Sequence, residues 1–341
     1  KEITGETLVE QYGAGSYTCF GCPLLCKREV QVKEGSVPVE KGPGPEYESA
    51  VSLGAMLLNK DLVGLLKANE TCNRMGLDTI SLGATLAWAV EAKERGALPP
   101  TYQPESELLG WGNSAGIIEM VKKIAYKQGK LPEILGHGSR FAAQQVGKNS
   151  SEYAIQVKGL ELGYHHPRVA RGMEITYATN PRGAVHMEFP IVFGWEDASY
   201  EDWIQQIITT SDQSTLPNAL TVCAHISNAL GVDFFARLLT AATGDEWDTR
   251  KMTRTSTRGW YLKRMFNALC GAGLDQDRLP QRVLDQMLEY NIDHPDFEGA
   301  LKLYHQARAL GMDGWPSKGR LKELELVEFY GLTEKLLGRK P

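Results

Sequence analysis

The chain lacks several features that would place a protein in a class at once. It contains no apolar run near the ~20 residues that a membrane span needs, and residues 1–10 lack the basic-then-apolar order of a signal peptide. There is no phosphate-binding loop, no G-x-G-x-x-G turn and no nucleophile elbow. These absences argue against a membrane-spanning protein and against the common nucleotide-binding and serine-hydrolase sites.

Net charge and cysteine content are also low. The 42 acidic residues exceed the 37 basic ones by only five, and a mildly acidic chain without long basic runs argues against nucleic acids and anionic membranes as partners. Six cysteines in 341 residues are too few for a disulfide scaffold, and reduced thiols favour a cytoplasmic location. Three of the six cysteines lie within eight positions, which makes them the first candidate site.

The residues that are present indicate a mainly α protein. The length is enough for about two domains of ~150 residues, and 42% apolar residues exclude a disordered chain. From 47 to 95 the apolar residues recur every three or four positions, interrupted at Gly76 and ended by Gly96. Short strands are expected only at 153–157 and 184–187. Further helices are expected over 114–127, 132–145, 200–210, 233–242, 257–269, 279–288 and 297–310.

A long polar segment suggests where one domain ends and the next begins. Residues 158–190 contain four glycines, three prolines, three histidines and three arginines, with little helical periodicity. Long loops in compact domains are usually functional. We therefore predict a boundary after Gln156, giving helical domains over 1–156 and 157–341, with this segment opening the second domain.

The clustered cysteines have the spacing C-x2-C-x3-C. A single loop of this kind can turn three thiolates toward one centre, but a closed zinc or [4Fe-4S] site needs a fourth ligand from elsewhere. An iron–sulfur cluster is the favoured interpretation, because zinc sites more often pair one C-x2-C with a second. Three unligated buried cysteines are the remaining alternative. The loop ligands would be Cys19, Cys22 and Cys26, and the fourth would be Cys72, Cys223 or Cys270.

The cysteine segment and the motifs that follow it resemble, in order, the tungsten-containing aldehyde ferredoxin oxidoreductase family. The resemblance implies two helical domains like domains 2 and 3 of that family. The N-terminal β-rich domain that forms the floor of the pterin site is absent from this sequence, so a missing domain or a partner chain would supply it. The matching segments are 19–26, 44–49, 68–69, 76–81, 158–162, 167–168, 177–186, 264–267 and 273–275.

The resemblance also implies the cofactors. In the family a [4Fe-4S] cluster lies beside a tungsten, or sometimes molybdenum, ion held by two molybdopterin dithiolenes. The positions of the four cluster ligands are matched by Cys19, Cys22, Cys26 and Cys223. Cys72 and Cys270 are then expected to be small buried core residues.

Two related motifs of the family bind the pterins, and in this sequence both motifs depart from the family pattern. The motif D-x-x-G-L-D reads N-R-M-G-L-D over 73–78, and D-x-x-G-L-C reads N-A-L-T-V-C over 218–223. Asparagine accepts one hydrogen bond but loses the assistance of a negative charge. Arg168, Arg171 and Arg182 could meet pterin phosphates or an acidic substrate, or could instead form ion pairs between the domains. The predicted pterin contacts are therefore Asn73, Asp78 and Asn218, which the resemblance implies, and Arg182, which its charge suggests.

Glu48 and His186 match the residues that flank the metal in the family. An imidazole can donate a hydrogen bond to an aldehyde oxygen, and a buried carboxylate can take a proton from an attacking water. The alternatives are a glutamate that caps a helix and a histidine bonded to backbone. The neighbouring pair His165–His166 is predicted to position its loop rather than bind a metal together.

Some family members bind a single iron at a dimer interface, using a glutamate and a histidine. Those positions correspond here to Lys67 and to a site near Ile118. Neither side chain can replace the lost ligand. We therefore predict no interface iron, so any homodimer would have to form through other contacts.

The leading hypothesis is the C-terminal portion of a tungsten- or molybdenum-pterin oxidoreductase. It would oxidise a small-molecule aldehyde to a carboxylic acid and pass electrons through the cluster to ferredoxin or another iron–sulfur carrier. Two alternatives stay open. One is a relative that reduces an aromatic-ring thioester, and the other is a cluster-only or cofactor-free electron-transfer or scaffold module.

Overall fold

The chain divides into two compact units that are described separately. The computed structural model describes residues 1–167, 170, 172–187, 199–289, 296–330 and 332. The first unit comprises Lys1–Tyr164 with Pro280–Arg282, and the second comprises His165–Leu279 with the chain from Val283 onward. The division thus follows residue 164, eight residues after the predicted position. The strands β4 (Gln156–Val157) and β5 (Leu160–Glu161) form a hairpin at this position, and its buried Glu161 accepts hydrogen bonds from Ser139 N and Oγ at 2.6 and 2.7 Å.

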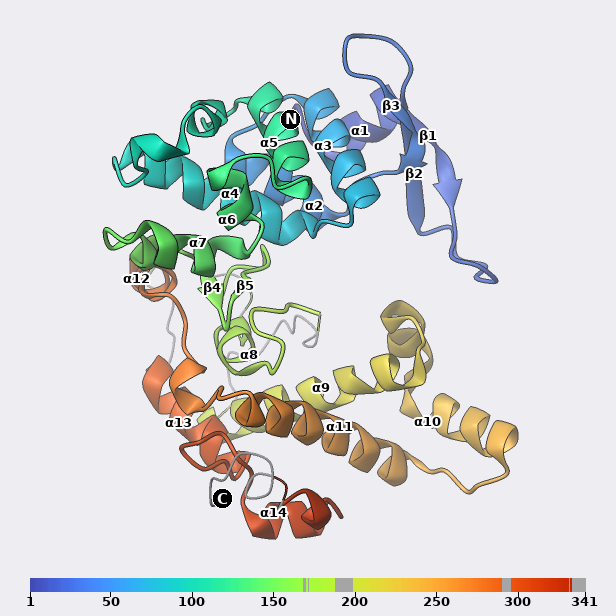
Figure 1. Cartoon of the computed structure of the whole chain (residues 1–341). Helices are drawn as coiled ribbons and strands as arrows, with labels where there is room; N and C mark the ends of the chain where they lie inside the picture. The colour runs from blue at the N-terminus through green and yellow to red at the C-terminus, as the bar shows by residue number, and fades with distance from the viewer. Residues whose placement is uncertain (168–169, 171, 188–198, 290–295, 331, 333–341) are drawn as a thin grey trace. The chain divides into compact units, whose positions relative to one another are not determined.

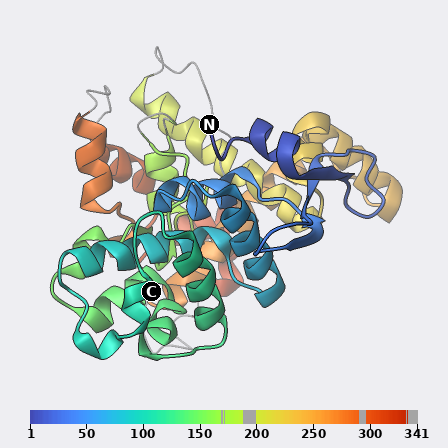
Figure 2. The same cartoon turned by 90° about the horizontal axis from the view of Figure 1, so that it is seen from above.

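The first unit is a cluster of helices around one apolar core. Helix α2 packs on α4, and α3 packs on both α2 and α5. The core includes Leu65, Leu86 and Val121, none of them more than 1% exposed. Figure 1 shows these helices in blue to green, and Figure 2 shows them from above. The helices are α1 (Gly5–Tyr12), α2 (Tyr47–Leu53), α3 (Leu62–Met75), α4 (Thr79–Glu94), α5 (Ser114–Ala125), α6 (Lys130–Leu135) and α7 (Gly138–Val146).

Helices α2 and α4 approach each other closely because Gly83 has no side chain. A Cβ added there would lie 2.0 Å from Ser52 Oγ. The same hydroxyl donates to Thr79 O and Ile80 O at 2.8 and 3.0 Å, which ties the last turn of α2 to the first turn of α4. This contact places the start of α4 beside Glu48.

A small antiparallel sheet precedes α2, in the order β1–β2–β3. Its strands are β1 (Gly13–Tyr17), β2 (Lys27–Val32) and β3 (Val39–Pro43). The sheet buries only Val30, Val32 and Val39, which pack on Leu62 and Leu66 of α3. No strand was expected here from the sequence, because its glycines, lysines and glutamates hide the two-residue alternation of a strand. The cysteine segment is the connection between β1 and β2.

The second unit is built on two long antiparallel helices. Helices α9 and α11 lie side by side (Figure 1), and α8 packs on α13 with all seven of its residues buried. Helix α12 begins in the short 280–282 segment assigned to the first unit. The helices are α8 (Met173–Thr179), α9 (Tyr200–Leu220), α10 (Ala224–Thr243), α11 (Thr249–Leu269), α12 (Gln281–Glu289), α13 (Phe297–Ala307) and α14 (Lys318–Glu323).

The mainly α prediction is confirmed, with differences at particular elements. The single helix expected over 132–145 is two helices, α6 and α7, separated at Gly136–His137. Residues 184–187 are not a strand, and β4 covers only Gln156–Val157 of the strand expected at 153–157. Within the described residues no individual helix is long and apolar enough to cross a membrane, although Glu201–Leu220 and Ala224–Thr243, bent by 102°, meet that composition test as a pair.

Candidate functional site

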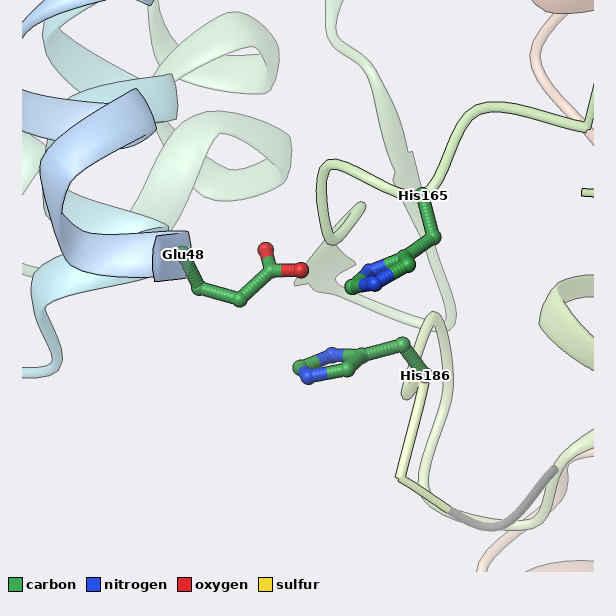
Figure 3. A group of neighbouring side chains, drawn as sticks. All are labelled: Glu48, His165 and His186. Atoms are coloured by element: carbon green, nitrogen blue, oxygen red, sulfur yellow. The ribbon is translucent and has the colours of Figure 1, made fainter. Parts of the chain in front are cut away.

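Glu48 stands in the first turn of α2 and points inward. The residue is 7% exposed, and its Oε2 accepts a hydrogen bond from Tyr164 N–H at 2.8 Å. The N-cap position belongs to Glu46, so Glu48 is not the capping residue of the alternative interpretation. Its carboxylate is held by the backbone N–H of Tyr164, which belongs to the same unit (Figure 3 draws Glu48 extending from α2).

The surroundings of Glu48 are polar but well packed. Ser49 Oγ lies 2.6 Å from Thr79 Oγ1, which adds a second link between α2 and the start of α4. Burial raises the pKa of Tyr164 well above its ordinary value. The phenol therefore stays neutral and can act only as a hydrogen-bonding group beside the carboxylate.

His186 belongs to the second unit and stacks on His165. The ring centroids are 5.1 Å apart and the planes differ by 13° (Figure 3). Tyr177 Oη donates to His165 O at 3.3 Å, which connects this stack to α8. The adjacent His166 instead has Gln286 Oε1 of α12 at 3.1 Å from its Nε2. The two neighbouring histidines therefore have different partners and do not present both rings to one centre.

The loop before His186 is a tight turn. Gly183 N donates to Asn180 O at 3.0 Å, and Arg182 N donates to Asn180 Oδ1 at 2.8 Å. Proline at the second position and glycine at the fourth suit such a turn, and Gly183 has a φ of +97°. The turn leaves Arg182 exposed while its neighbours are buried. A guanidinium so placed can meet an anion such as a phosphate.

The two related motifs form the same kind of helix junction. Gly76 ends α3 with φ +70° and ψ 33°, and Thr221 ends α9 with φ +55° and ψ 35°. In each case the next residue donates to the carbonyl five positions earlier, Cys72 O at 3.0 Å or Pro217 O at 2.9 Å. The next helix begins directly afterwards. The motif is therefore a left-handed helix end followed by a helix start, which explains why the family pattern has glycine at this position.

Two of the residues that were predicted to contact a pterin, Asn73 and Asp78, lie at the first junction. Asp78 is the N-cap of α4, and its Oδ1 accepts from Ser81 N at 2.7 Å. Asn73 is exposed on the last turn of α3 and lines a pocket of about 280 Å³ with Glu70, Arg74 and the strand β3. At the second junction Asn218 is exposed on α9, its Nδ2 3.5 Å from Ser214 O.

The cysteine loop lies on the surface of the first unit. Cys19 and Cys26 are exposed, Cys22 is half-buried, and Cys22 N donates to Cys19 O at 3.0 Å, closing a turn between two of the thiols. Phe20, Leu24 and Leu25 beside them are also exposed. Within the described part of the chain the three sulfur atoms are not gathered around one point. The ligand set remains a prediction from the spacing and the resemblance.

The other three cysteines differ in exposure. Cys223, in the second unit, is exposed at the start of α10. Cys72 is fully buried, as predicted, and burial raises its pKa to about 12. The prediction that Cys270 is a core residue is wrong, because α11 ends at Leu269 and Cys270 is its exposed C-cap.

Lys67 and Ile118, the positions of the lost iron ligands, make contacts within the first unit. Lys67 Nζ lies 2.7 Å from Glu70 Oε2 and donates to Pro38 O at 2.9 Å, while Ile118 packs against the core. The absence of an interface iron stays a prediction. Arg168 and Arg171, named as candidate anion contacts, lie outside the described residues.

Sequence reasoning missed two residues that hold the candidate groups. Tyr164 supplies the N–H to Glu48, and a backbone donor leaves no trace in a sequence. Asn267 of α11 donates through Nδ2 to Pro181 O in the turn before His186. Asn267 did appear in a motif of the resemblance, but nothing in that motif indicated its partner.

Comparison with known proteins shows the family to which the chain is similar. Residues 1–326 match the family described as "Aldehyde ferredoxin oxidoreductase, domains 2 & 3". The tungsten-containing aldehyde ferredoxin oxidoreductases of Pyrococcus furiosus and Thermococcus kodakarensis are 33% and 32% identical over 96% of this chain. This chain spans about 55% of the length of those relatives.

The fold is shared with a further solved structure. The active-site complex BamBC of benzoyl coenzyme A reductase, solved with 1,5-dienoyl-CoA, superposes with a TM-score of 0.78 at 19% identity. The superposition covers 98% of this chain and 56% of that one. The match over 326 residues and the identity to the tungsten enzymes lead to one conclusion: this chain belongs to the aldehyde ferredoxin oxidoreductase family, of which it contains domains 2 and 3.

Proposed function

We propose that this chain is the helical, cofactor-holding portion of a tungsten- or molybdenum-pterin oxidoreductase that oxidises an aldehyde to a carboxylic acid. The observation that carries the proposal is the 33% identity to a tungsten-containing aldehyde ferredoxin oxidoreductase over 96% of the chain. The overall reaction is R–CHO + H2O → R–COOH + 2 H⁺ + 2 e⁻. When bound, the metal centre would accept the electron pair and a [4Fe-4S] cluster would pass the electrons singly to ferredoxin or a similar carrier.

In this proposal Glu48 and His186 handle the proton and the carbonyl oxygen. The Glu48 carboxylate is largely buried and is oriented by the Tyr164 N–H, so it can accept a proton from the attacking water at a fixed atom. The His186 imidazole, held in its stack with His165, can donate a hydrogen bond to the aldehyde oxygen as negative charge develops there. The neutral phenol of Tyr164 adds no competing charge beside the carboxylate.

The residues present fit the proposed cofactors. The turn between Cys19 and Cys22 and the exposure of the thiols suit a loop that folds onto a cluster, with Cys223 as the fourth ligand. Exposed Arg182 suits a pterin phosphate. Asn73, Asp78 and Asn218 would meet the pterin rings through oxygen acceptors at the two helix junctions. The N-terminal pterin domain, or a partner chain, would complete the site.

Anaerobic purification followed by elemental analysis tests the proposal. We expect iron, tungsten or molybdenum, and broad absorption near ~400 nm that dithionite bleaches. Turnover would be followed with a panel of aldehydes and a viologen dye as electron acceptor. Colourless protein containing zinc, or protein that reduces an aromatic-ring thioester and leaves aldehydes untouched, would contradict this function.

The fourth cluster ligand can be tested with a matched pair of thiols. Cys223→Ser is expected to lower the iron content per chain, because one iron of the cluster loses its ligand. Cys270→Ser is the control, since Cys270 is also exposed and lies outside the proposed ligand set. Equal iron in both variants would reject Cys223 as a ligand.

A further inference from the structure

The segment that carries His186 is anchored by a side chain 86 residues further along the chain. Asn267 Nδ2 donates to the carbonyl of Pro181, the second residue of the turn Asn180–Gly183. Pro181 is buried, and its carbonyl is not an acceptor in the turn's hydrogen bonds from Gly183 N and Arg182 N, which use Asn180 O and Oδ1. Asn267 therefore ties the turn to α11 at a carbonyl that takes no part in those two hydrogen bonds.

The support behind Asn267 is rigid. One helical turn earlier on α11, Arg264 is fully buried, and its Nη1 lies 2.8 Å from Oδ1 of the equally buried Asp277. Arg264 Nε also donates to Gly314 O at 3.3 Å, and a Cβ at Gly314 would lie 2.8 Å from Arg264 Nη2. Because this end of α11 is held on several sides, the donor of Asn267 has little freedom to shift.

The far end of the segment is ordered by the stack of the two imidazoles. His186 follows Gly183 by three residues, and between them Ala184 and Val185 are buried. The ring of His186 then lies against His165 at 5.1 Å between centroids. A displacement of the turn would be transmitted through this short buried link to the imidazole.

We propose that Asn267 is a positioning residue for His186, which it serves by clamping the Pro181 carbonyl. The catalytic part of this inference rests on the proposed function, whereas the clamping part does not. Asn267 itself touches no reacting atom. Its loss would let the turn and the His186 ring move, and displacements of about 1 Å at a catalytic group can lower turnover by up to ~100-fold.

The test compares Asn267→Asp, Asn267→Ala and the control Asn228→Ala in the cofactor-containing protein. Asp is isosteric but turns the donor into an acceptor that repels the Pro181 carbonyl; Ala removes the group; Asn228 is an exposed residue of α10. We expect both Asn267 variants to lower kcat by about tenfold or more with little change in KM, while N228A behaves as wild type.

A second readout does not depend on turnover. Diethyl pyrocarbonate modifies accessible imidazoles, and peptide mass spectrometry separates His186 from His165. We expect both Asn267 variants to react several times faster at His186 than wild type does, with melting temperatures close to that of wild type. Wild-type modification rates and wild-type kcat in both variants would overturn the proposal. If His186→Ala kept full turnover, the proposed function would lose its catalytic histidine, yet faster modification in N267D would still establish the clamp.

Discussion

At the scale of single residues, two glutamates two positions apart at the start of α2 have opposite surroundings. The side chain of Glu46 is 64% exposed and pairs with Lys27 Nζ at 3.0 Å, an interaction that raises the pKa of Lys27. Glu48, two positions later, is buried and receives the Tyr164 N–H. The two residues are of the same type, so it is their position at the start of the helix that makes Glu46 part of a surface ion pair and Glu48 a candidate proton acceptor.

This difference predicts unequal effects of the same substitution. Glu48→Gln keeps an oxygen that can accept from Tyr164 N–H but removes the proton acceptor, so turnover should fall by about 100-fold or more with the fold intact. Glu46→Gln loses only an exposed ion pair, which contributes little, and should keep near wild-type turnover. Steady-state kinetics with circular dichroism as a folding check would decide. Equal activities in the two variants would remove Glu48 from the mechanism.

The thiols can be told apart by their reactivity. With its pKa raised to about 12, Cys72 stays protonated at pH 8 and should resist iodoacetamide until the protein unfolds. The exposed thiols of Cys19, Cys26, Cys223 and Cys270 should be alkylated in cofactor-free protein. After reconstitution with iron and sulfide, only Cys270 among these four should remain reactive. Mass spectrometry of the labelled peptides measures this, and protection of Cys270 instead would contradict the ligand assignment.

At the scale of elements, the two helix junctions explain why the family motif has a glycine and what it costs this chain to have Thr221 at the second junction. Each junction requires one residue in the left-handed region to end a helix and start the next. Gly76 adopts this conformation without strain, whereas Thr221 is a β-branched residue at φ +55°. The second junction therefore has the same geometry as the first, but it carries a backbone strain at Thr221 that the first junction does not have.

Exchanging the residue types should change stability in opposite directions. Gly76→Ala is expected to lower the free energy of unfolding by about 1 kcal/mol, since a Cβ is disfavoured at φ +70°. Thr221→Gly should raise it by up to about 1 kcal/mol, because relief of strain exceeds the added flexibility of the unfolded chain. Urea unfolding of both variants provides the measurement. A destabilised T221G would mean that contacts of the threonine side chain outweigh the strain.

At the scale of the whole molecule, the two units differ in the side chains that fill their cores. The first is closed mainly by aliphatic contacts. The second contains a fully buried guanidinium, Arg308, stacked 3.7 Å above the ring of Trp260 and paired with Asp212 Oδ1 at 2.6 Å. Burial by itself lowers the pKa of Arg308, but the neighbouring Tyr304 and the negative charge of Asp212 outweigh it and raise the pKa above its already high ordinary value, so the guanidinium stays charged.

Arg308 should therefore matter for one unit only. Arg308→Met leaves the buried Asp212 with the Thr257 hydroxyl at 2.8 Å but without a positive charge, and breaking a buried ion pair in this way typically costs about 3–5 kcal/mol. Hydrogen exchange is expected to accelerate in α9, α11 and α13, and to stay unchanged in α4 and α5 of the first unit. Exchange measured by mass spectrometry resolves these helices. Uniform acceleration across both units would show that the chain unfolds as a single cooperative body.

The sequence predicted helices best where apolar periodicity was strong, as over 62–75 and 79–94. The single helix expected from 47 to Gly76 is wrong, because it is two helices, α2 and α3, separated at 54–61. It did not reveal the sheet β1–β3, since only three of its valines are deeply buried and the rest of it faces solvent. The split between α6 and α7 was also missed, because the apolar spacing continues across Gly136. Cys270 was misjudged because its apolar neighbours say nothing about where α11 ends.

What the sequence by itself determined is the family, the mainly α fold and the candidate chemistry at Glu48, His186 and the cysteines. The family, the fold class and the candidate residues can be predicted in this way because they depend on the residue types and on their order along the chain. Only the tertiary structure decided which groups hold the candidates: Tyr164 N–H for Glu48 and Asn267 for the turn before His186. Such partners lie 86 and 116 residues apart, and hydrogen bonds over that separation depend on how the helices pack rather than on any local pattern.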